Sequence, residues 1–308
     1  MQPRTVADLG EFGLIARVAT RLDCPPPPAG PGDDAAVVSA PDGRIVATTD
    51  LLVEGVHFRF DWSSPRDVGV KAAAANLADV AAMGARPTAL LLGVALPGRT
   101  GLAVVDGLVD GLRDECARAG AAVVGGDTVS ADRIMLAVTA LGDLDGRPPV
   151  QRRTARPGML VVAGRLGHSA AGLDLLRAGV DEFPELLAAH RRPQPEYAAG
   201  IALARAGATA LCDISDGLVA DLGHLLGDRL GADLALPDDA LLRAAGERLG
   251  VDPAVWQATG GEDHGLLAVL PRGASVAGTT VLGTVSERPG IRGVPATAGR
   301  GGHDHFGR

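Results

Sequence analysis

Aspartates recur where short apolar runs of this sequence meet turns rich in glycine or hydroxyl residues. This setting is shared by Asp33, Asp50, Asp127, Asp213 and Asp216, and Asp79 lies near Asn76 in a helix-like segment. Carboxylates gathered at strand ends repel one another and lose hydration unless a cation neutralises them. Because oxygen ligands without paired histidines or a CxxC pair suit Mg²⁺ better than zinc, the set predicts a magnesium site. Hydroxyl ligands or phosphate contacts would come from Thr48, Thr49 and Ser215.

One glycine-rich segment, Gly125-Gly126-Asp127-Thr128, follows a predicted buried strand. Its small residues and backbone N–H groups would allow close approach by a chain of phosphates. It is not a Walker A loop, and the chain has neither the HRD nor the DFG motif of protein kinases. Taken singly, each Gly-Asp or Asp-Gly pair is more typical of an ordinary turn. Only the combined set of aspartates favours a metal site with a phosphate ligand.

Two further polar residues leave alternatives open. Lys71, the only lysine, is either a cation near the phosphate site or a remnant of an arginine-biased composition. His57 could donate to a phosphate or to a bound substrate, or could be an ordinary hydrogen-bonded residue after a strand. No Ser-His-Asp or Cys-His arrangement is suggested, so nucleophilic catalysis of the protease kind is not expected.

Bulk properties restrict the class of protein. A length of 308 residues suffices for two domains. The net charge of −8 argues against nucleic acid or an anionic membrane surface as a partner. No apolar run approaches the roughly 20 residues of a membrane span, and the N-terminus lacks a signal-peptide core. Three scattered cysteines, Cys24, Cys116 and Cys212, predict a reduced cytoplasmic location.

Apolar runs and helical periodicities alternate along the chain, which predicts mixed α/β layers. Helices are expected over 1–22, 64–83, 102–119, 170–178 and 196–205, with another after 217. Strands are expected over 37–38, 45–47, 89–96, 121–124, 134–141, 159–163, 210–212, 266–270 and 279–285. The stretch 48–58 is expected to form strand, turn and strand. A linker-like segment over 142–149 predicts domains at 1–145 and 146–308.

Several short motifs in a fixed order resemble the thiamine-monophosphate kinase family, which belongs to the superfamily of aminoimidazole ribonucleotide synthetase. The resemblance covers nearly the whole chain. It rests on Gly32-Asp33-Asp34-Ala35-Ala36, Thr48-Thr49-Asp50 through His57-Phe58, Asn76 through Ala85, Gly125-Gly126-Asp127-Thr128, Asp213-Ile214-Ser215-Asp216-Gly217-Leu218, Gly260-Gly261-Glu262-Asp263 and Asp304-His305-Phe306.

The resemblance implies a two-domain fold of the aminoimidazole ribonucleotide synthetase type. The N-terminal domain would carry a mixed sheet with helices, bind ATP and Mg²⁺, and pair with a second copy to form a homodimer. The C-terminal α/β domain would close the active site. The implied activity is ATP-dependent phosphorylation of thiamine phosphate to thiamine diphosphate, by direct in-line transfer and with several Mg²⁺ ions.

By the same resemblance, residues can be assigned to ligands. Mg²⁺ would be held by Asp33, Thr48, Thr49, Asp50, Asp79, Asp127, Asp213 and Asp216. ATP would contact Gly126, Asp127, Arg152 and Ser215, and thiamine phosphate would contact His57, Glu262 and His303. The catalytic residues would be Asp50, Asp127 and Arg152. His303 stands where the family usually has tryptophan, and Met159 where it commonly has an acidic residue.

Rival functions come from two classes. One is another ATP-using enzyme of the superfamily, such as aminoimidazole ribonucleotide synthetase or the hydrogenase-maturation dehydratase. The dehydratase carries its chemistry on a C-terminal cysteine, whereas this chain ends in Phe306-Gly307-Arg308. The other class is a non-catalytic regulator that binds a nucleotide or thiamine phosphate. The large set of carboxylates argues against it, because binding alone does not require so many metal ligands.

Overall fold

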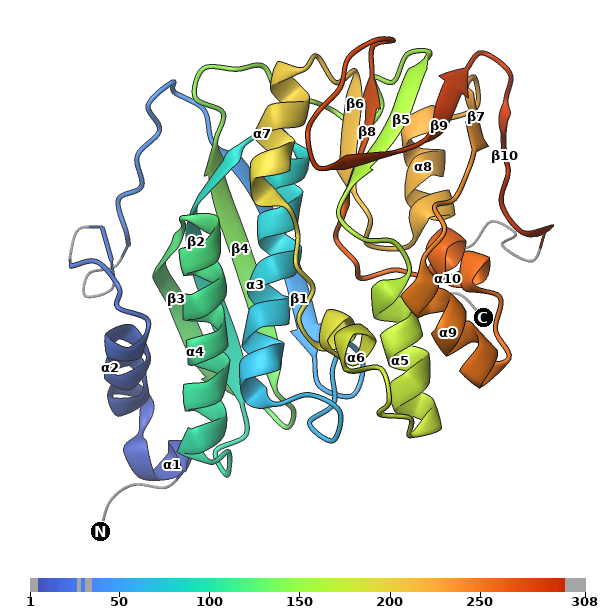
Figure 1. The fold of residues 1–308 in the computed structure, drawn as a ribbon. Coiled ribbons are helices and arrows are strands. Elements are labelled where there is room, and N and C mark those ends of the chain that lie inside the picture. Colours follow the sequence, from blue (N-terminus) through green and yellow to red (C-terminus); the bar gives the residue numbers. More distant parts are fainter. Residues whose placement is uncertain (1–4, 27–28, 31–34, 297–308) are drawn as a thin grey trace. The chain divides into compact units, whose positions relative to one another are not determined.

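The computed structural model describes residues 5–26, 29–30 and 35–296, drawn in colour in Figure 1. Two compact units divide the chain: residues 1–80 with 87–146, and residues 81–86 with 147–308. Each unit contains one sheet, and strands and helices are mixed in both. The expected α/β fold class is confirmed.

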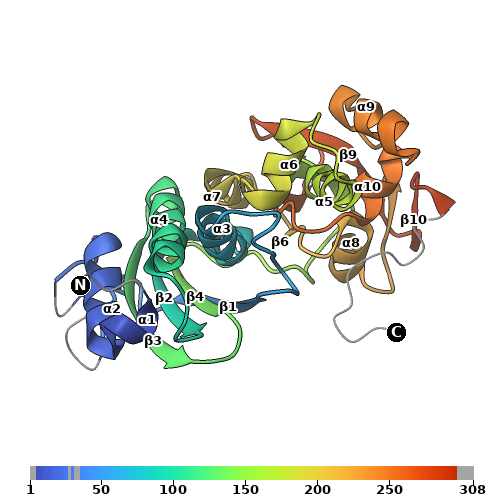
Figure 2. The same ribbon diagram turned by 90° about the horizontal axis from the view of Figure 1, so that it is seen from below.

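The first unit has a four-stranded sheet in the order β1-β4-β2-β3. Its strands are β1 (Val46–Val53), β2 (Arg86–Leu96), β3 (Ala122–Ser130) and β4 (Met135–Asp143). β1 runs antiparallel to β4, and β2 runs parallel to β3. The helices are α1 (Val6–Leu9), α2 (Glu11–Arg21), α3 (Pro65–Ala82) and α4 (Leu102–Ala119). Figure 2 shows α2, α3 and α4 on the same face of the sheet.

Helices α3 and α4 pack almost backbone to backbone. A Cβ added to Gly69 would lie 2.0 Å from the carbonyl oxygen of Leu108, and one added to Gly111 would lie 2.0 Å from that of Arg66. The middle of α3 is a fully buried alanine run over 72–74. Small side chains therefore make this core, which explains how a chain with 3% aromatic residues builds it.

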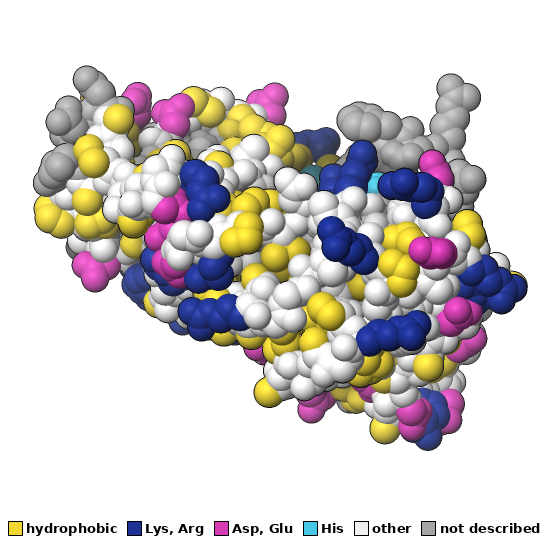
Figure 3. Space-filling view, turned by 90° about the horizontal axis from the view of Figure 1, so that it is seen from above, with side chains coloured by type: hydrophobic (Ala, Val, Ile, Leu, Met, Phe, Trp, Pro, Cys, Tyr) yellow, Lys and Arg dark blue, Asp and Glu magenta, His cyan; other side chains and the backbone are white. Residues whose placement is uncertain are grey.

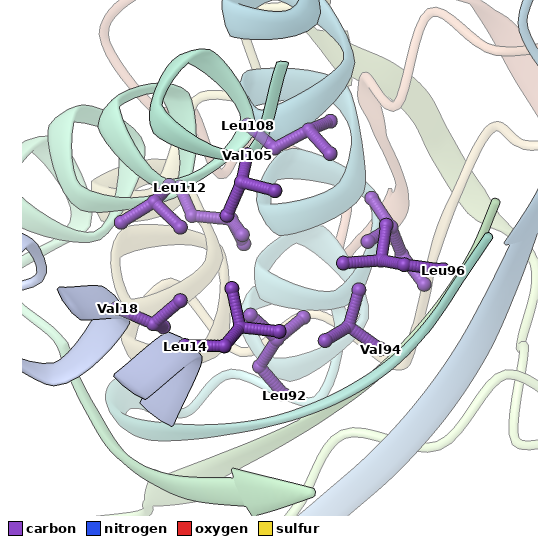
Figure 4. A pocket seen from close by; sticks show the side chains of 10 residues that line it. Leu14, Val18, Leu92, Val94, Leu96, Val105, Leu108 and Leu112 are labelled. Atoms are coloured by element: carbon purple, nitrogen blue, oxygen red, sulfur yellow. The ribbon is translucent and has the colours of Figure 1, made fainter. Parts of the chain in front are cut away.

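Helix α2 covers the β2–β3 half of the sheet. Its Leu14 and Val18 point toward side chains of α4 and β2 around a small apolar gap of about 20 Å³ (Figure 4). At its polar side, Arg17 donates to both carboxylate oxygens of Asp106 at 2.6 and 2.5 Å, and Arg21 donates to Asp110 at 2.5 Å. The helix is thus fixed by apolar contacts and by partly exposed ion pairs.

The opposite face of this sheet carries no helix in Figure 2 and exposes four large apolar side chains. Leu51 is 53% exposed, Val129 54%, Leu91 37% and Met135 36%. We call these four residues the open face. Side chains of this size are normally buried when they occur together on a sheet.

The second unit has a six-stranded sheet in the order β10-β7-β9-β5-β8-β6. Its strands are β5 (Gly158–Ala163), β6 (Ala210–Asp213), β7 (Gly231–Leu234), β8 (Leu266–Leu270), β9 (Thr279–Ser286) and β10 (Gly290–Arg292). Its helices are α5 (His168–Ala178), α6 (Pro184–Arg191), α7 (Tyr197–Arg205), α8 (Leu218–Leu226), α9 (Ala240–Leu249) and α10 (Pro253–Thr259). Strands β5 and β8 are almost entirely buried, so the core of the unit lies against them.

Several local expectations are wrong. Residues 37–38 form no strand, and the stretch after β1 is a turn in which Glu54 and Phe58 make only an isolated bridge. Gly125–Thr128 lies inside β3 rather than in a turn, because β3 pairs with β2 as far as Ser130. The helix expected over 1–22 is interrupted at Gly10, whose φ of 72° is left-handed. Helix α6 lies in a polar, proline-containing region for which no helix was expected.

Basic side chains are dispersed among apolar and acidic ones on the face shown in Figure 3. That face therefore offers no continuous basic stripe of the kind that follows a phosphate backbone. Within the described ranges, no helix is long and apolar enough to cross a membrane.

Candidate functional site

Strand β1 and helix α3 bring one group of predicted ligands together. Thr48 Oγ1 donates to Asp79 Oδ2 at 2.8 Å, and the Asp50 N–H donates to Asn76 Oδ1 at 2.9 Å. Thr48 and Asp50 pair with Ala140 and Val138, both fully buried. Since residues opposite each other on antiparallel strands share a face, Thr48 and Asp50 lie on the α3 side of the sheet.

Asn76 completes this group, and sequence reasoning did not assign it a role. It is fully buried, and its Nδ2 donates to the Ala72 carbonyl at 2.9 Å while its Oδ1 holds the Asp50 backbone. An amide side chain in a run of buried alanines was the available signal, because a buried polar group must find partners.

Thr49 belongs to the opposite face of β1. Its Oγ1 donates to the Val138 carbonyl at 3.0 Å and accepts from Thr139 Oγ1 at 3.1 Å. The alternation of side chains along a strand separates it from its neighbours Thr48 and Asp50. The structure therefore does not bring the two threonines to one point.

Asp127 lies far from Asp50 within the first unit. β1 and β3 are the two edges of the sheet, so three strand spacings, or about 14 Å, separate them. Asp127 pairs with Gly93 of β2. A Cβ added to Gly93 would lie 3.3 Å from the side chain of Ala137 in β4, so these two residues share a face. Ala137 in turn pairs with the exposed Leu51 of β1. Asp127 is thus on the side of the open face. One ion with metal–oxygen bonds of about 2–2.6 Å cannot touch both carboxylates in one copy of this unit.

Gly126 has a structural reason to be glycine. A Cβ at this position would lie 1.9 Å from the Leu92 carbonyl oxygen, so the approach of β2 already excludes any side chain. Beside it, a cavity of about 110 Å³ lies between α2 and the segment Gly125–Thr128. The α2 wall is aliphatic, with Ile15, Val18 and Ala19, and Cys24 also lines the cavity.

His57 lies in the turn after β1 and not on a second strand. Its Nδ1 accepts from the Val53 N–H at 3.0 Å. In the neutral ring the proton is therefore on Nε2, which makes that atom the donor.

In the second unit, Asp213 ends β6, and the loop that leads to α8 carries Ser215 and Asp216. Asp213 Oδ2 lies 3.1 Å from His264 Nδ1. The backbone N–H groups of Ser215, Asp216 and Gly217 donate to Oδ2 of Asp221, which sequence reasoning did not single out. Burial, reinforced by the charge of Asp213, raises the pKa of Asp221 to about 7.

The segment around Glu262 is fixed against this loop. Glu262 and His264 have left-handed φ values of 62° and 52°, which are costly for residues with a Cβ. Between them, the buried Asp263 accepts from the N–H groups of Gly167 and Ser169 at 2.5 and 2.8 Å. Burial raises the pKa of Asp263 to about 7. Glu262 Oε2 lies 3.5 Å from His190 Nδ1, and the same nitrogen lies 3.3 Å from the Ser169 hydroxyl.

Arg152 is exposed in the segment before β5. Burial raises the pKa of the Cys212 thiol well above its usual value, and the positive charge of Arg152 opposes this rise. Arg152 therefore lies in the neighbourhood of Cys212, near the end of β6. Asp33 and His303 lie outside the described residues.

The oxygen donors suit Mg²⁺ in small sets rather than as one cage. In the part of the chain that the structure describes, no three His, Cys, Asp or Glu side chains converge on one point. Two carboxylates and a hydroxyl from β1 and α3, and two carboxylates from the β6–α8 loop, are hard ligands. Mg²⁺ commonly combines one or two carboxylates with waters and substrate phosphates, so the donor sets fit this ion.

Comparison with known proteins gives a consistent result. A family described as "AIR synthase related protein, N-terminal domain" matches residues 32–144. The thiamine-monophosphate kinase of Mycobacterium tuberculosis is 48% identical over 293 residues, which are 92% of this chain and 87% of that protein. The solved thiamine monophosphate kinase of Aquifex aeolicus has a TM-score of 0.76 at 32% identity, covering 92% and 96% of the two chains.

A further solved structure, AaThiL complexed with AMPPCP and TMP, has a TM-score of 0.77 at 32% identity and covers 99% of both chains. The expected resemblance is thus confirmed over nearly the full length. On this identity and coverage, the chain belongs to the thiamine-monophosphate kinase family.

Proposed function

We propose that this protein transfers the γ-phosphoryl group of ATP to thiamine phosphate and releases thiamine diphosphate and ADP. The observation that carries the proposal is the match, over 99% of both chains, to a kinase structure complexed with AMPPCP and TMP. AMPPCP is an analogue of ATP, so both substrates of the proposed reaction have a counterpart in that complex. The 48% identity to a thiamine-monophosphate kinase supports the same activity.

Mg²⁺ would be held in several separate places. Thr48, Asp50 and Asp79 form one donor set, and Asp213 and Asp216 belong to another. Thr49, Asp127 and Asp33 remain part of the proposal, and the separation of Asp50 from Asp127 supports several ions rather than one. When bound, the ions supply neutralisation of the phosphate charges.

The two substrates would meet different residues. Gly126, Asp127, Arg152 and Ser215 would contact ATP, and the largely apolar cavity beside Gly126 supports a nucleotide on this edge of the sheet. His57, Glu262 and His303 would contact thiamine phosphate. Nε2 of His57 is the donor in the neutral ring and suits a phosphate oxygen, and the carboxylate of Glu262 suits the cationic ring of thiamine.

The transfer itself requires little proton chemistry. A phosphate oxygen of thiamine phosphate attacks the γ-phosphorus, and the bond from that phosphorus to the bridging oxygen of ADP breaks. The attacking oxygen is already anionic near neutral pH, so no strong base is needed. Asp50 and Asp127 would hold the phosphates in place through the Mg²⁺ ions that they bind. Arg152 would stabilise the charge that develops on the transferred group.

A homodimer and a cytoplasmic location are part of the proposal. The open face of the first unit supports pairing with a second copy, because its four large apolar side chains are 36–54% exposed. Three free cysteines are in keeping with a reducing compartment. Residues 1–145 would bind ATP and Mg²⁺ and pair the two copies, and residues 146–308 would close over the site.

A coupled assay of ADP release, with and without thiamine phosphate, tests the function. Release that depends on thiamine phosphate and on Mg²⁺, with thiamine diphosphate as the product, is expected. ADP release that ignores thiamine phosphate would indicate another ATP-using enzyme of the superfamily. Binding of both substrates without turnover would indicate a regulator.

A further inference from the structure

The loop between β6 and α8 is organised around one buried atom. The successive N–H groups of Ser215, Asp216 and Gly217 all donate to Oδ2 of Asp221, at 3.1, 3.0 and 3.1 Å. Asp221 lies in the first turn of α8 and is 6% exposed. Three donors on a single oxygen define the position of that loop closely.

Converging backbone N–H groups form a concave site for an anion, and such sites often hold phosphate. Here the anion is a side chain of α8, the helix that follows the loop. Burying it beside Asp213 and Asp216 costs free energy, because burial and like charges both disfavour the ionised form. With their N–H groups occupied by Asp221, Ser215 and Asp216 are left to meet a ligand through their side chains.

The carbonyl side of the loop is held just as firmly. Ser215 O accepts from the Glu262 N–H at 2.9 Å, and Ile214 O accepts from the His264 N–H at 3.0 Å. The Ile214 N–H donates to Gly265 O at 2.9 Å. The loop is therefore held from two directions. The Asp221 side chain accepts from three of its N–H groups, and the backbone of residues 262–265 bonds to Ile214 and Ser215.

We propose that Asp221 is a positioning residue. It occupies the N–H groups of the loop and thereby aims the side chains of Ser215 and Asp216 at the Mg²⁺–nucleotide. The ligand is identified by the proposed function, on which this inference rests. What matters at position 221 is an acceptor oxygen at one place, and neither negative charge nor direct ligation by Asp221 is required.

Two substitutions separate position from charge. Asp221→Asn keeps an oxygen in place and removes the charge, whereas Asp221→Glu keeps the charge and moves the oxygen by one methylene. Asp239 provides the matched control, since it caps α9 by accepting from Leu241 and Leu242 at 2.9 and 3.0 Å. Calorimetry with AMPPCP and MgCl₂ on the full chain, together with thermal unfolding without ligand, gives readouts other than turnover.

We expect Asp221→Asn to bind AMPPCP–Mg²⁺ within about threefold of wild type and Asp221→Glu to bind it roughly 10- to 100-fold more weakly. Asp239→Asn and Asp239→Glu should shift only the unfolding temperature. Wild-type affinity in Asp221→Glu, or loss of affinity in Asp221→Asn, would overturn the proposal. If Asp221→Glu does not fold, Asp221→Ser, whose hydroxyl is too short to reach all three amides, takes its place with the same expectation.

The proposed function can fail separately. A wild-type protein that binds AMPPCP–Mg²⁺ but does not phosphorylate thiamine phosphate would refute the kinase assignment. The comparison of Asp221→Asn with Asp221→Glu would still be decided by nucleotide affinity.

Discussion

The two units of this protein hold their acidic residues in opposite ways. In the first unit, Asp50 and Asp127 lie on different edges and different faces of one sheet, about 14 Å apart. In the second, Asp213 ends β6, Asp216 lies in the short loop that follows, and Asp221 lies in the first turn of α8. Hydrogen bonds to the segment 262–265 fix that loop further.

This difference shows which contacts hold the donor residues of each unit in place. The loop of the second unit is held by the Asp221 side chain and by backbone hydrogen bonds to residues 262–265. The donors of the first unit are fixed singly by α3 and by strand pairing, so only several ions, a chain of phosphates or a second copy can connect them. The open face beside Asp127 favours a second copy of the chain as one of the connections between these donors.

Removing a carboxylate from the first unit should have the largest effect. Asp50→Asn and Asp127→Asn should each lower kcat roughly 10²- to 10³-fold, because charge neutralisation of the phosphates is lost. Thiamine diphosphate formation under saturating ATP measures this. Near-normal turnover in either variant at ordinary Mg²⁺ would contradict the metal assignment.

Mixing the two inactive variants sharpens the comparison. If Asp50 of one copy and Asp127 of another serve one site, half of the sites in mixed dimers are intact, and about a quarter of wild-type activity returns after exchange of subunits. No recovery, with exchange verified by differently tagged chains, would mean that each copy of the first unit works alone.

Close helix packing in the first unit predicts a strong steric effect. Gly69→Ala should lower the free energy of unfolding by about 1–3 kcal/mol, because its Cβ would lie 2.0 Å from the Leu108 carbonyl. Gly223→Ala in α8 is the control in the second unit, where no atom lies within 4 Å of the added Cβ. It should raise that free energy by about 0.5–1 kcal/mol. Urea unfolding measures both, and equal effects would refute the packing argument.

The buried carboxyls of the second unit predict a dependence of stability on pH. The folded-state pKa of Asp263 is raised to about 7, above an unfolded value of roughly 3.9. A proton is therefore bound more tightly in the folded state, and this stabilisation is complete below pH ~4 and lost as pH rises through ~7. Asp221 acts in the same direction.

We expect the free energy of unfolding to fall from pH 5 to pH 7 by at most roughly 1.4 kcal/mol per pH unit for each of these two groups. Asp263→Asn should remove about half of that slope, which urea unfolding at several pH values would measure. Stability that rises over this interval would contradict the assignment.

An exposed ion pair in the first unit should have the smallest effect. The guanidinium of Arg17 lowers the pKa of Asp106, but the Arg17 side chain is 38% exposed. Arg17→Met should therefore cost less than about 1 kcal/mol, and high salt should reduce the cost. A loss as large as that of Gly69→Ala would mean that the position of α2 depends on its charges rather than on Leu14 and Val18.

Local patterns in the sequence determined much of the fold. The helix expected over 102–119 has those bounds in the structure, and the strand expected over 266–270 is β8. In both cases a long apolar pattern ends at a residue that stops the element, Gly120 with a φ of 73° or Pro271. Residues 37–38 were misassigned as a strand because no partner strand pairs with them. Gly125–Thr128 was misassigned as a turn because it pairs with the distant strand β2.

The chemistry of the site could also be inferred from residue types, because several aspartates with neighbouring hydroxyls fit Mg²⁺ and phosphate whatever their arrangement. Residue types alone could not show that Asp50 and Asp127 lie on opposite faces of a sheet, or that Asn76 and Asp221 hold the backbone beside the ligands. Strand order, strand face and hydrogen bonds between distant segments exist only once the chain has folded. The sequence alone therefore indicated the ligands and the family, while the tertiary structure decided which carboxylates can share an ion.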